Sequence, residues 1–359
     1  MRIRLESRGE HSPAWLYLSP VVAVLLTLAS GVVIFSALGK DPGAALFTFF
    51  VQPWLDGYSR TELVVKAAPL ALIGIGLSLG FRANVWNIGA EGQFTMGAIA
   101  GAGLAIFAPE DSGYILLVGV LIFGVLGGMA WGAIPAFLRT KFNANEILTS
   151  LMLSYVAILF LSYLVHGPWR DPGGFNFPES KLFPDGAVLP ILVEGTRLHM
   201  GTLFALAAVV AGWIFLARSA VGFQMKVLGL APAAARYAGF KEKRLVWLAL
   251  LISGGAAGLA GAAEVSGPIG QLLPSISPGY GFTAIIAAFL GRLHPVGVLL
   301  AAFVMALTYI GGEMAQIEIG LSAAVTGLFQ GILLFFLLAC DVLTSYRLRI
   351  GSPRTQGAA

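Results

Sequence analysis

Long apolar stretches recur along this chain and restrict its fold more than any other feature. Hydrophobic residues make up 57% of the sequence and charged residues 11%, and the mean hydropathy is +0.85. A soluble domain carries roughly 25% charged residues, whereas a helix that spans a bilayer needs about 20 mostly apolar ones. The sequence therefore predicts an all-α, polytopic integral membrane protein. The ten candidate spans are residues 14–37, 63–81, 91–108, 114–138, 146–165, 200–217, 245–263, 281–293, 296–311 and 320–340.

The eighth stretch, residues 281–293, is short for a span and has glycine and proline nearby. Its surroundings are SPGYGFTAIIAAFLGRLHP. Non-helical backbone is tolerated at membrane depth only where protein or a water-filled cavity surrounds it. We therefore expect either a spanning helix or a broken, re-entrant segment at this place.

The N-terminal segment is basic, and the apolar run after it continues to Leu38. A secretory signal peptide has an apolar core of only about 7–15 residues before its cleavage site. The first apolar run is therefore predicted to be an uncleaved membrane helix.

Basic residues are distributed unevenly between the two sides that ten spans create. With a cytoplasmic N-terminus, 6 of the 22 Lys and Arg residues fall outside and 22 − 6 = 16 fall inside. Cytoplasmic loops are enriched in Lys and Arg, and an even number of spans returns the C-terminus to the cytoplasmic side. The six outer residues are Lys40, Arg60, Lys66, Arg170, Lys181 and Arg197.

We expect one transmembrane domain over residues 1–359. The segments outside the membrane would be the cytoplasmic N-terminus (1–13), an outer loop (166–199), a basic inner loop (218–244) and a cytoplasmic tail (341–359). The outer loop holds Trp169, Phe175 and Phe177, and aromatic side chains of this kind suit a protein interface.

Several chemistries lack support in the sequence. No phosphate-binding G-x-x-x-x-G-K-[ST] loop is present, so this chain is not expected to hydrolyse ATP. The four histidines are scattered without metal-ligand spacing, and the only cysteine, Cys340, excludes an internal disulfide. The net charge of +4 does not indicate nucleic acid, because the basic residues lie at helix ends rather than in one patch.

The inner loop contains the stretch GLAPAAARYAGF. Pro232 suits the first turn of a helix and alanine has the highest helix propensity, so we expect a helix of about two turns at the inner surface. It is either an interfacial helix whose basic neighbours face lipid headgroups or a docking helix for a cytoplasmic partner. The docking residues would be Gly229, Ala233, Ala234, Ala235, Tyr237 and Gly239.

The stretch FRANVWNIGAEGQ interrupts the apolar pattern with amides and a carboxylate. Asn84, Asn87, Glu91 and Gln93 form either a tight inner loop, with Arg82 at the water edge, or a polar site inside the membrane. A charged group at bilayer depth costs roughly 2.5–3.5 kcal/mol on insertion scales, so it is usually buried in protein or faces a cavity. Inside the membrane these four residues would line a substrate pathway, or Glu91 would instead fix a neighbouring helix.

The stretch NANEILTSLML has a simpler explanation than a direct role in transport. Asn143 or Asn145 can cap a helix by accepting hydrogen bonds from its first N–H groups, and Glu146 favours the first turn electrostatically.

These segments together resemble the membrane subunits of ATP-binding-cassette importers in the ribose and branched-chain amino acid permease superfamily, and most closely its nucleoside and simple-sugar branch. NVWNIGAEGQ is similar to the Asn-Ile-Gly-x-Glu-Gly-Gln signature, NANEILTSLMLSY to the Asn-Glu segment, and GLAPAAARYAGF to the coupling segment. GYGFTAIIAAFLGRLHPVGV resembles the Gly-Tyr-Gly-Phe and Leu-Gly-x-x-x-Pro-x-Gly pair. The four motifs follow the order of the family. Trp86, often Phe in the family, and His294, more commonly Asn, depart from it in places that bear on substrate choice.

The resemblance implies the pathway-forming half of an ATP-driven importer in a bacterial inner membrane. A second, related permease would complete the pore as a heterodimer, two copies of an ATPase would dock inside, and a substrate-binding protein would dock outside. ATP and Mg would bind to the ATPase, and this chain would bind no cofactor. The solute would be a nucleoside or a simple sugar, with Tyr280 and Phe282 either stacking on a nucleobase or lying in an aromatic belt.

Two other classes stay open at this point. An ion- or proton-coupled secondary transporter would use Glu91 as its ion site and would need no ATPase. A structural membrane subunit would have no pathway of its own. Among importers, a branched-chain amino acid or another small polar solute is also open, because the external binding protein, a different chain, selects the solute first.

Overall fold

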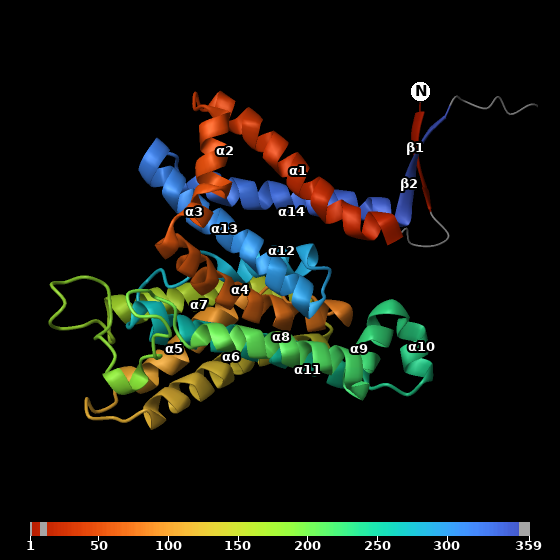
Figure 1. Ribbon diagram of the computed structural model, residues 1–359. Coiled ribbons are helices and arrows are strands. Elements are labelled where there is room, and N and C mark those ends of the chain that lie inside the picture. Colours follow the sequence, from red (N-terminus) through yellow and green to blue (C-terminus); the bar gives the residue numbers. More distant parts are fainter. Residues whose placement is uncertain (1, 8–12, 352–359) are drawn as a thin grey trace, which may run out of the picture. The chain divides into compact units, whose positions relative to one another are not determined.

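The computed structural model describes residues 2–7 and 13–351. The chain divides into two compact units (Figure 1). Unit 1 combines Met1–Pro53 with Gly311–Ala359, and unit 2 is Trp54–Ile310. Two helices contain the boundaries between the units, α3 (Gln52–Leu55) and α13 (Pro295–Ile319).

Ten helices coincide with the ten predicted spans, which confirms an all-α, polytopic membrane protein. In the described part of the chain, eight helices are long and apolar enough to cross a bilayer. They are α1 (Pro13–Ala37), α4 (Gly57–Arg82), α6 (Ile115–Phe142), α7 (Glu146–His166), α8 (Gly201–Arg218), α11 (Glu242–Glu264), α13 and α14 (Ala323–Ser345). The other two, α5 (Ala90–Ile106) and α12 (Tyr280–Leu290), are shorter.

Phenylalanine side chains join α1, α14 and α2 (Pro42–Phe50) in unit 1. Phe329 of α14 stacks on Phe35 of α1 and on Phe49 of α2, with ring centroids 5.4 and 5.2 Å apart. Such pairs contribute about 0.5–1.5 kcal/mol beyond the area that they bury. Asp41 caps α2 by accepting hydrogen bonds from the N–H groups of Gly43 and Ala44.

The two ends of the described chain pair with each other. Strands β1 (Arg2–Ser7) and β2 (Tyr346–Gly351) are antiparallel, with Arg2 opposite Gly351. Because β1 precedes α1 and β2 follows α14, this pairing places both ends on the same side of the membrane. An even number of crossings requires that arrangement, in agreement with the distribution of basic residues.

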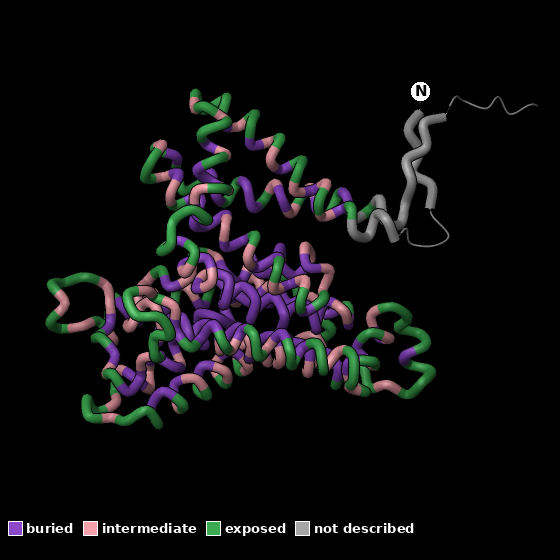
Figure 2. The backbone as a smooth tube through the Cα atoms, in the orientation of Figure 1, coloured by how far each residue is buried: buried purple, intermediate pink, exposed green. Residues whose placement is uncertain are grey.

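Glycines bring α5, α6 and α11 close together in unit 2, where Figure 2 shows mostly buried backbone. A Cβ atom added at Gly97 would lie 2.2 Å from the Gly258 Cα, and one added at Gly128 would lie 2.1 Å from the Gly254 carbonyl oxygen. Lipid supplies no hydrophobic force between helices, so close packing of small residues stabilises the bundle. α4 packs against α11 and α12.

α12 is a half-span. Its 11 residues extend about 16 Å, roughly half of the ~30 Å hydrocarbon core. The chain reaches it from the π-helical turn η2 (Val265–Ile269) through a non-helical segment, and Gly279 starts α12 with a φ of +96°. The eighth predicted span therefore takes the broken form.

Two connecting segments complete unit 2. The outer loop contains one 3-10 turn, η1 (Asp185–Ala187), and an isolated bridge between Ile191 and His199. The inner loop forms α9 (Ala220–Leu230) and α10 (Pro232–Tyr237), which adjoin α8 and α11 along the chain (Figure 1).

Candidate functional site

The polar run that follows α4 enters the bundle. Asn84 is exposed, with a left-handed φ of 56°, but Asn87 is buried and its amide donates to Ser253 Oγ at 2.7 Å. Ser253 lies midway between Glu242 and Glu264, the ends of α11, and so about 16 Å from each. The run therefore reaches the middle depth of the membrane-spanning bundle.

Asn87 and Gln93 form a closed pair of amides. Asn87 Nδ2 donates to Gln93 Oε1 at 2.7 Å, and Gln93 Nε2 donates back to Asn87 Oδ1 at 3.2 Å. The same Asn87 oxygen accepts the Gly89 N–H at 3.0 Å. Both polar atoms of Asn87 therefore have protein partners in this conformation, and its contact with a solute stays a prediction.

Glu91 holds the start of α12. Its Oε2 accepts the Gly281 N–H at 2.6 Å, and the Ser277 hydroxyl and the Phe282 N–H also donate to the carboxylate. A carboxylate is favoured here because the first N–H groups of a helix lack partners within it. The contact expected of a helix-fixing Glu91 is therefore present, and its place on a substrate pathway stays a prediction.

Tyr280 and Phe282 occupy different environments. Tyr280 is almost fully buried and packs edge-on against Phe94 and Tyr309, at centroid distances of 5.9 and 5.8 Å. Phe282, two residues later, is partly exposed. The Tyr280 ring is thus part of the bundle interior, and stacking of either ring on a nucleobase stays a prediction.

A cap and an ion pair hold the inner end of the bundle. Asn145 Oδ1 accepts hydrogen bonds from two N–H groups in the first turn of α7, which confirms the predicted cap. Glu146 pairs with Arg139 of α6 and also accepts the Trp86 N–H at 3.4 Å. The polar run is thereby joined to the α6–α7 corner.

A second set of charged side chains, which sequence reasoning did not single out, lies in unit 2. Arg197 Nη1 is 3.3 Å from Glu62 Oε2. The Tyr280 hydroxyl is 3.5 Å from Glu264 Oε1, and Lys66 Nζ is 5.9 Å from the centroid of the Tyr280 ring. We call the four charged residues, Glu62, Lys66, Arg197 and Glu264, the outer charge cluster.

The outer charge cluster had a signal in the sequence. Lys66 lies inside the predicted span 63–81, and Glu264 directly follows the span 245–263. The distribution of basic residues treated Lys66 as part of an outer segment, but α4 begins at Gly57 and includes it. An ionisable residue within a spanning helix is a candidate functional residue in its own right.

The inner-loop helix α10 has a buried side and an exposed side. Ala235 is buried against the bundle, whereas Ala233 and Ala234 are exposed and the Tyr237 side chain is 97% exposed. Gly239 ends the helix with a φ of +78°. The predicted short helix therefore forms, and its docking role stays a prediction.

Gly229 fixes this segment to the rest of unit 2. A Cβ atom at Gly229 would lie 2.0 Å from the Arg82 carbonyl oxygen, so only glycine allows α9 to approach the end of α4 this closely. The inner loop and the end of α4 are thus in direct backbone contact.

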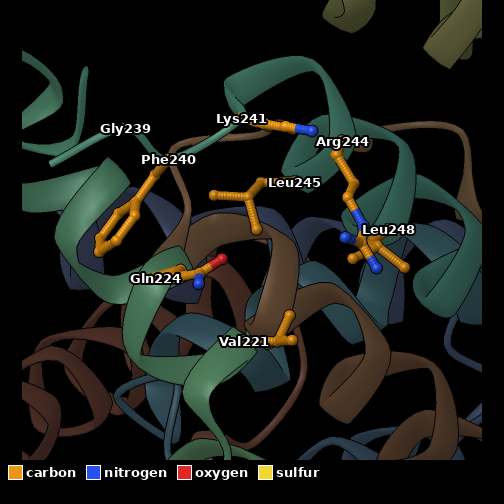
Figure 3. A pocket seen from close by; sticks show the side chains of 8 residues that line it. All are labelled: Val221, Gln224, Gly239, Phe240, Lys241, Arg244, Leu245 and Leu248. Atoms are coloured by element: carbon orange, nitrogen blue, oxygen red, sulfur yellow. The ribbon is translucent and has the colours of Figure 1, made fainter.

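A pocket of about 260 Å³ opens beside α10 (Figure 3). Two basic side chains, Lys241 and Arg244, line it together with apolar ones from α9 and α11. The lining residues are Val221, Gln224, Gly239, Phe240, Lys241, Arg244, Leu245 and Leu248. A partner that covers α10 would therefore also meet a hollow lined by positive charge.

A half-span, a polar network at mid-depth and an exposed inner helix define a class, the polytopic membrane transport proteins. Residues 59–338 match the family described as the branched-chain amino acid transport system permease component, and the chain belongs to this family.

Named relatives cover most of the chain. It is 38% identical to the glucose ABC transporter permease protein TsgB13 of Haloferax volcanii, over 95% of this chain and 92% of the relative. It is 30% identical to the guanosine ABC transporter permease protein NupP of Bacillus subtilis, over 95% and 97% of the two chains. A second protein of that bacterium, the guanosine ABC transporter permease protein NupQ, is 28% identical over 69% and 81%.

Proposed function

We propose that this chain forms the membrane pathway of an ATP-driven importer for nucleosides or related simple sugars, in the inner membrane of a bacterial cell. The family assignment supports a permease subunit. The relatives named for glucose and guanosine support the class of solute, since both compounds are neutral and carry several hydroxyl groups.

The exposed helix α10 carries the proposal. A helix that transmits force needs a rigid attachment and a free face, and α10 has both: Ala235 is packed into the bundle, and Tyr237 projects from it. A cytoplasmic ATPase would contact the exposed face, and its movement would reach α4 through the close contact of Gly229. ATP and Mg would bind to that ATPase, with no cofactor on this chain.

A second permease subunit would complete the pathway. NupP and NupQ are two different permease proteins of one organism, both named for guanosine, and both are similar to this chain. This supports a heterodimer of related permeases rather than a pathway made by one chain alone.

The outer loop would receive a substrate-binding protein. Phe175 and Phe177 are exposed on it by 93% and 64%, and exposed aromatic side chains are frequent anchors of protein interfaces. Trp169 has a different position, because it packs edge-on against Phe107 at 5.9 Å and is only partly exposed. Phe175 and Phe177 are therefore the proposed contacts.

The secondary-transporter alternative would need Glu91 to bind and release an ion. Its carboxylate accepts the Gly281 N–H at the start of α12, so an ion would have to compete with hydrogen bonds that hold the fold. This arrangement favours a structural role for Glu91 and thereby the importer.

Uptake by the reconstituted complex tests the proposal. The chain, a second permease, the ATPase and the binding protein from the same genome would be placed in vesicles with labelled guanosine, glucose and leucine. We expect guanosine or glucose to accumulate only with ATP and the binding protein. Uptake by this chain alone, driven by an ion gradient, would support the secondary transporter, and uptake of leucine alone would reassign the solute.

A further inference from the structure

Three members of the outer charge cluster, Glu62, Lys66 and Glu264, lie on membrane-spanning helices, and Arg197 lies in the outer loop. Lys66 is nine residues beyond Gly57, the first residue of α4, and so about 13 Å along that helix. Glu264 is the last residue of α11, directly before the π-helical turn η2. Ionisable residues in membrane helices mark substrate or ion pathways, and π-helical turns occur frequently at functional sites.

The charges of the cluster balance. Glu62 pairs with Arg197 at 3.3 Å, and the charged neighbours of Glu264 are Lys66, Arg197 and Glu62. Two carboxylates therefore face two cations. A buried ligand with a net charge would leave one of these groups without compensation, which is costly in a low-dielectric interior. A neutral ligand keeps the balance.

Three buried polar atoms, one in the cluster and two close to it in sequence, have no hydrogen-bond partner in the described part of the chain. Glu62 Oε1 belongs to the cluster, His199 Nε2 is two residues from Arg197, and Ser266 Oγ is two residues from Glu264. His199 Nδ1 accepts the Gly201 N–H at 3.1 Å, so in the neutral ring Nε2 carries the hydrogen and is a donor. The unused capacity is thus an acceptor, a donor and a hydroxyl. Solute hydroxyl groups, which both donate and accept, can supply partners of each kind.

The site is closed in this conformation. His199 and Glu264 line a cavity of about 10 Å³ between α4, α8 and α11, close to Ala68 and Pro69. That volume suits about one water molecule. Pro69 removes one backbone hydrogen bond from α4, and η2 interrupts the regular helix after α11, so both walls have a point at which they can bend.

We propose that the outer charge cluster, with His199 and Ser266, is a recognition site for the hydroxyl groups of a neutral solute on the outer half of the pathway. The inference rests on the proposed import function and adds the chemical class that this chain itself selects. Glu62 and Glu264 accept hydrogen bonds from the solute, His199 donates one, and Lys66 and Arg197 supply the opposite charges beside the two carboxyl groups.

The test compares guanosine with its 2′,3′-dideoxy analogue in the reconstituted complex, with the binding protein saturated by each compound. We expect the unmodified complex to transport guanosine faster. The double variant Lys66→Met with Glu264→Gln removes one charge of each sign. It is expected to lower guanosine uptake at least tenfold and to abolish the preference, with unchanged ATPase association. The matched control is Glu110→Gln, at an exposed glutamate between α5 and α6, which should transport as the unmodified complex does.

Ser266→Ala is the second variant, because it deletes only an unpartnered hydroxyl and leaves every ion in place. It should reduce the preference severalfold and assemble normally. If both variants assemble, transport guanosine at the unmodified rate and keep the preference for guanosine over its dideoxy analogue, the proposed recognition site is wrong. The proposed import function is not affected by that result. If the unmodified complex imports only leucine, which carries no hydroxyl group, the proposed class of solute is wrong. If it imports none of the compounds, the proposed function fails and this inference fails with it.

Discussion

The Glu91 carboxylate on α5 accepts the Gly281 N–H at the start of α12, across 190 positions of sequence, with 2.6 Å between the two heavy atoms. Both helices begin inside the bundle, so their first N–H groups have no water to bind. Glu91 supplies the missing acceptor for one helix from the first turn of the other. The two interruptions in the membrane-spanning structure therefore stabilise each other.

Gly281→Ala should disrupt this joint. The added Cβ would lie 2.1 Å from the Glu91 backbone nitrogen, so backbone must move. Overpacking of this kind costs about 1–3 kcal/mol or more, and we expect a clear loss of thermal stability in detergent. The matched control is Gly327→Ala on α14, where nothing lies within 4 Å of the new Cβ. Equal melting temperatures for the two variants would contradict the close contact.

Asn87→Ala should lower stability and uptake. It leaves the Gln93 side chain and the Gly89 N–H without their partner, and each unsatisfied buried group costs about 1–3 kcal/mol. In the fraction that assembles, uptake should fall more than ATP binding by the complex. Glu110→Ala, at an exposed position between α5 and α6, is the control. Undiminished transport of every nucleoside and sugar tested would remove Asn87 from the pathway.

Substitutions in the outer loop should affect only the interaction of this chain with the binding protein. Replacing Phe175 and Phe177 with serine removes two exposed aromatic side chains and no buried packing. We expect weaker stimulation of ATP hydrolysis by the loaded binding protein, measured as at least a tenfold higher half-saturating concentration. Leu182→Ser, at another exposed position of the same loop, is the control. If stimulation is the same in all three proteins, the docking surface lies elsewhere.

The spans and the cap of α7 were predictable from sequence because each depends on neighbouring residues. Hydropathy over about 20 residues reports the exchange of water for lipid, and Asn145 caps N–H groups two and three residues away. The half-span α12 was recognisable from its shortness and its flanking glycine and proline. None of these features depends on the tertiary arrangement of the bundle.

The candidate sites were only partly predictable because their partners are distant in sequence. The polar run 84–93 was recognised by composition, but its partners Ser253 and Gly281 come from other helices. Lys66 and Glu264 were not recognised as a pair, because a hydropathy window still reads as apolar when it contains one charge. Only the packing of the helices brings Lys66 to the ring of Tyr280 and Glu264 to its hydroxyl.

His199 should make stability depend on pH. Burial, and secondarily the charge of Arg197, lowers the pKa of His199 from 6.5 to about 4. The unfolded chain therefore binds one more proton than the folded protein between these values. The stabilisation that the neutral His199 ring contributes to the free energy of unfolding is fully present above pH 6.5. It is lost as the pH falls towards 4, by on the order of 3 kcal/mol. His199→Gln should flatten the fall in melting temperature between pH 7.5 and 4.5, whereas His166→Gln, at an exposed histidine, should not. Parallel curves for all three proteins would contradict a buried, neutral His199.

The exposed face of α10 should be required for coupling. Ala234→Trp places a large side chain where a close fit to the ATPase is proposed, and overfilled contacts cost about 1–3 kcal/mol; Tyr237→Ala removes the side chain that is 97% exposed. Neither residue is buried, so membrane insertion and melting temperature should be unchanged. In each of the two variants we expect at least a tenfold decrease in ATPase co-purification or in solute-stimulated ATP hydrolysis. Ala324→Trp, at an exposed position of α14 outside the proposed docking segment, is the control for bulk alone. If Ala234→Trp and Tyr237→Ala both keep full ATPase association and full uptake, α10 is a membrane-surface helix, and the importer loses the observation that carries it.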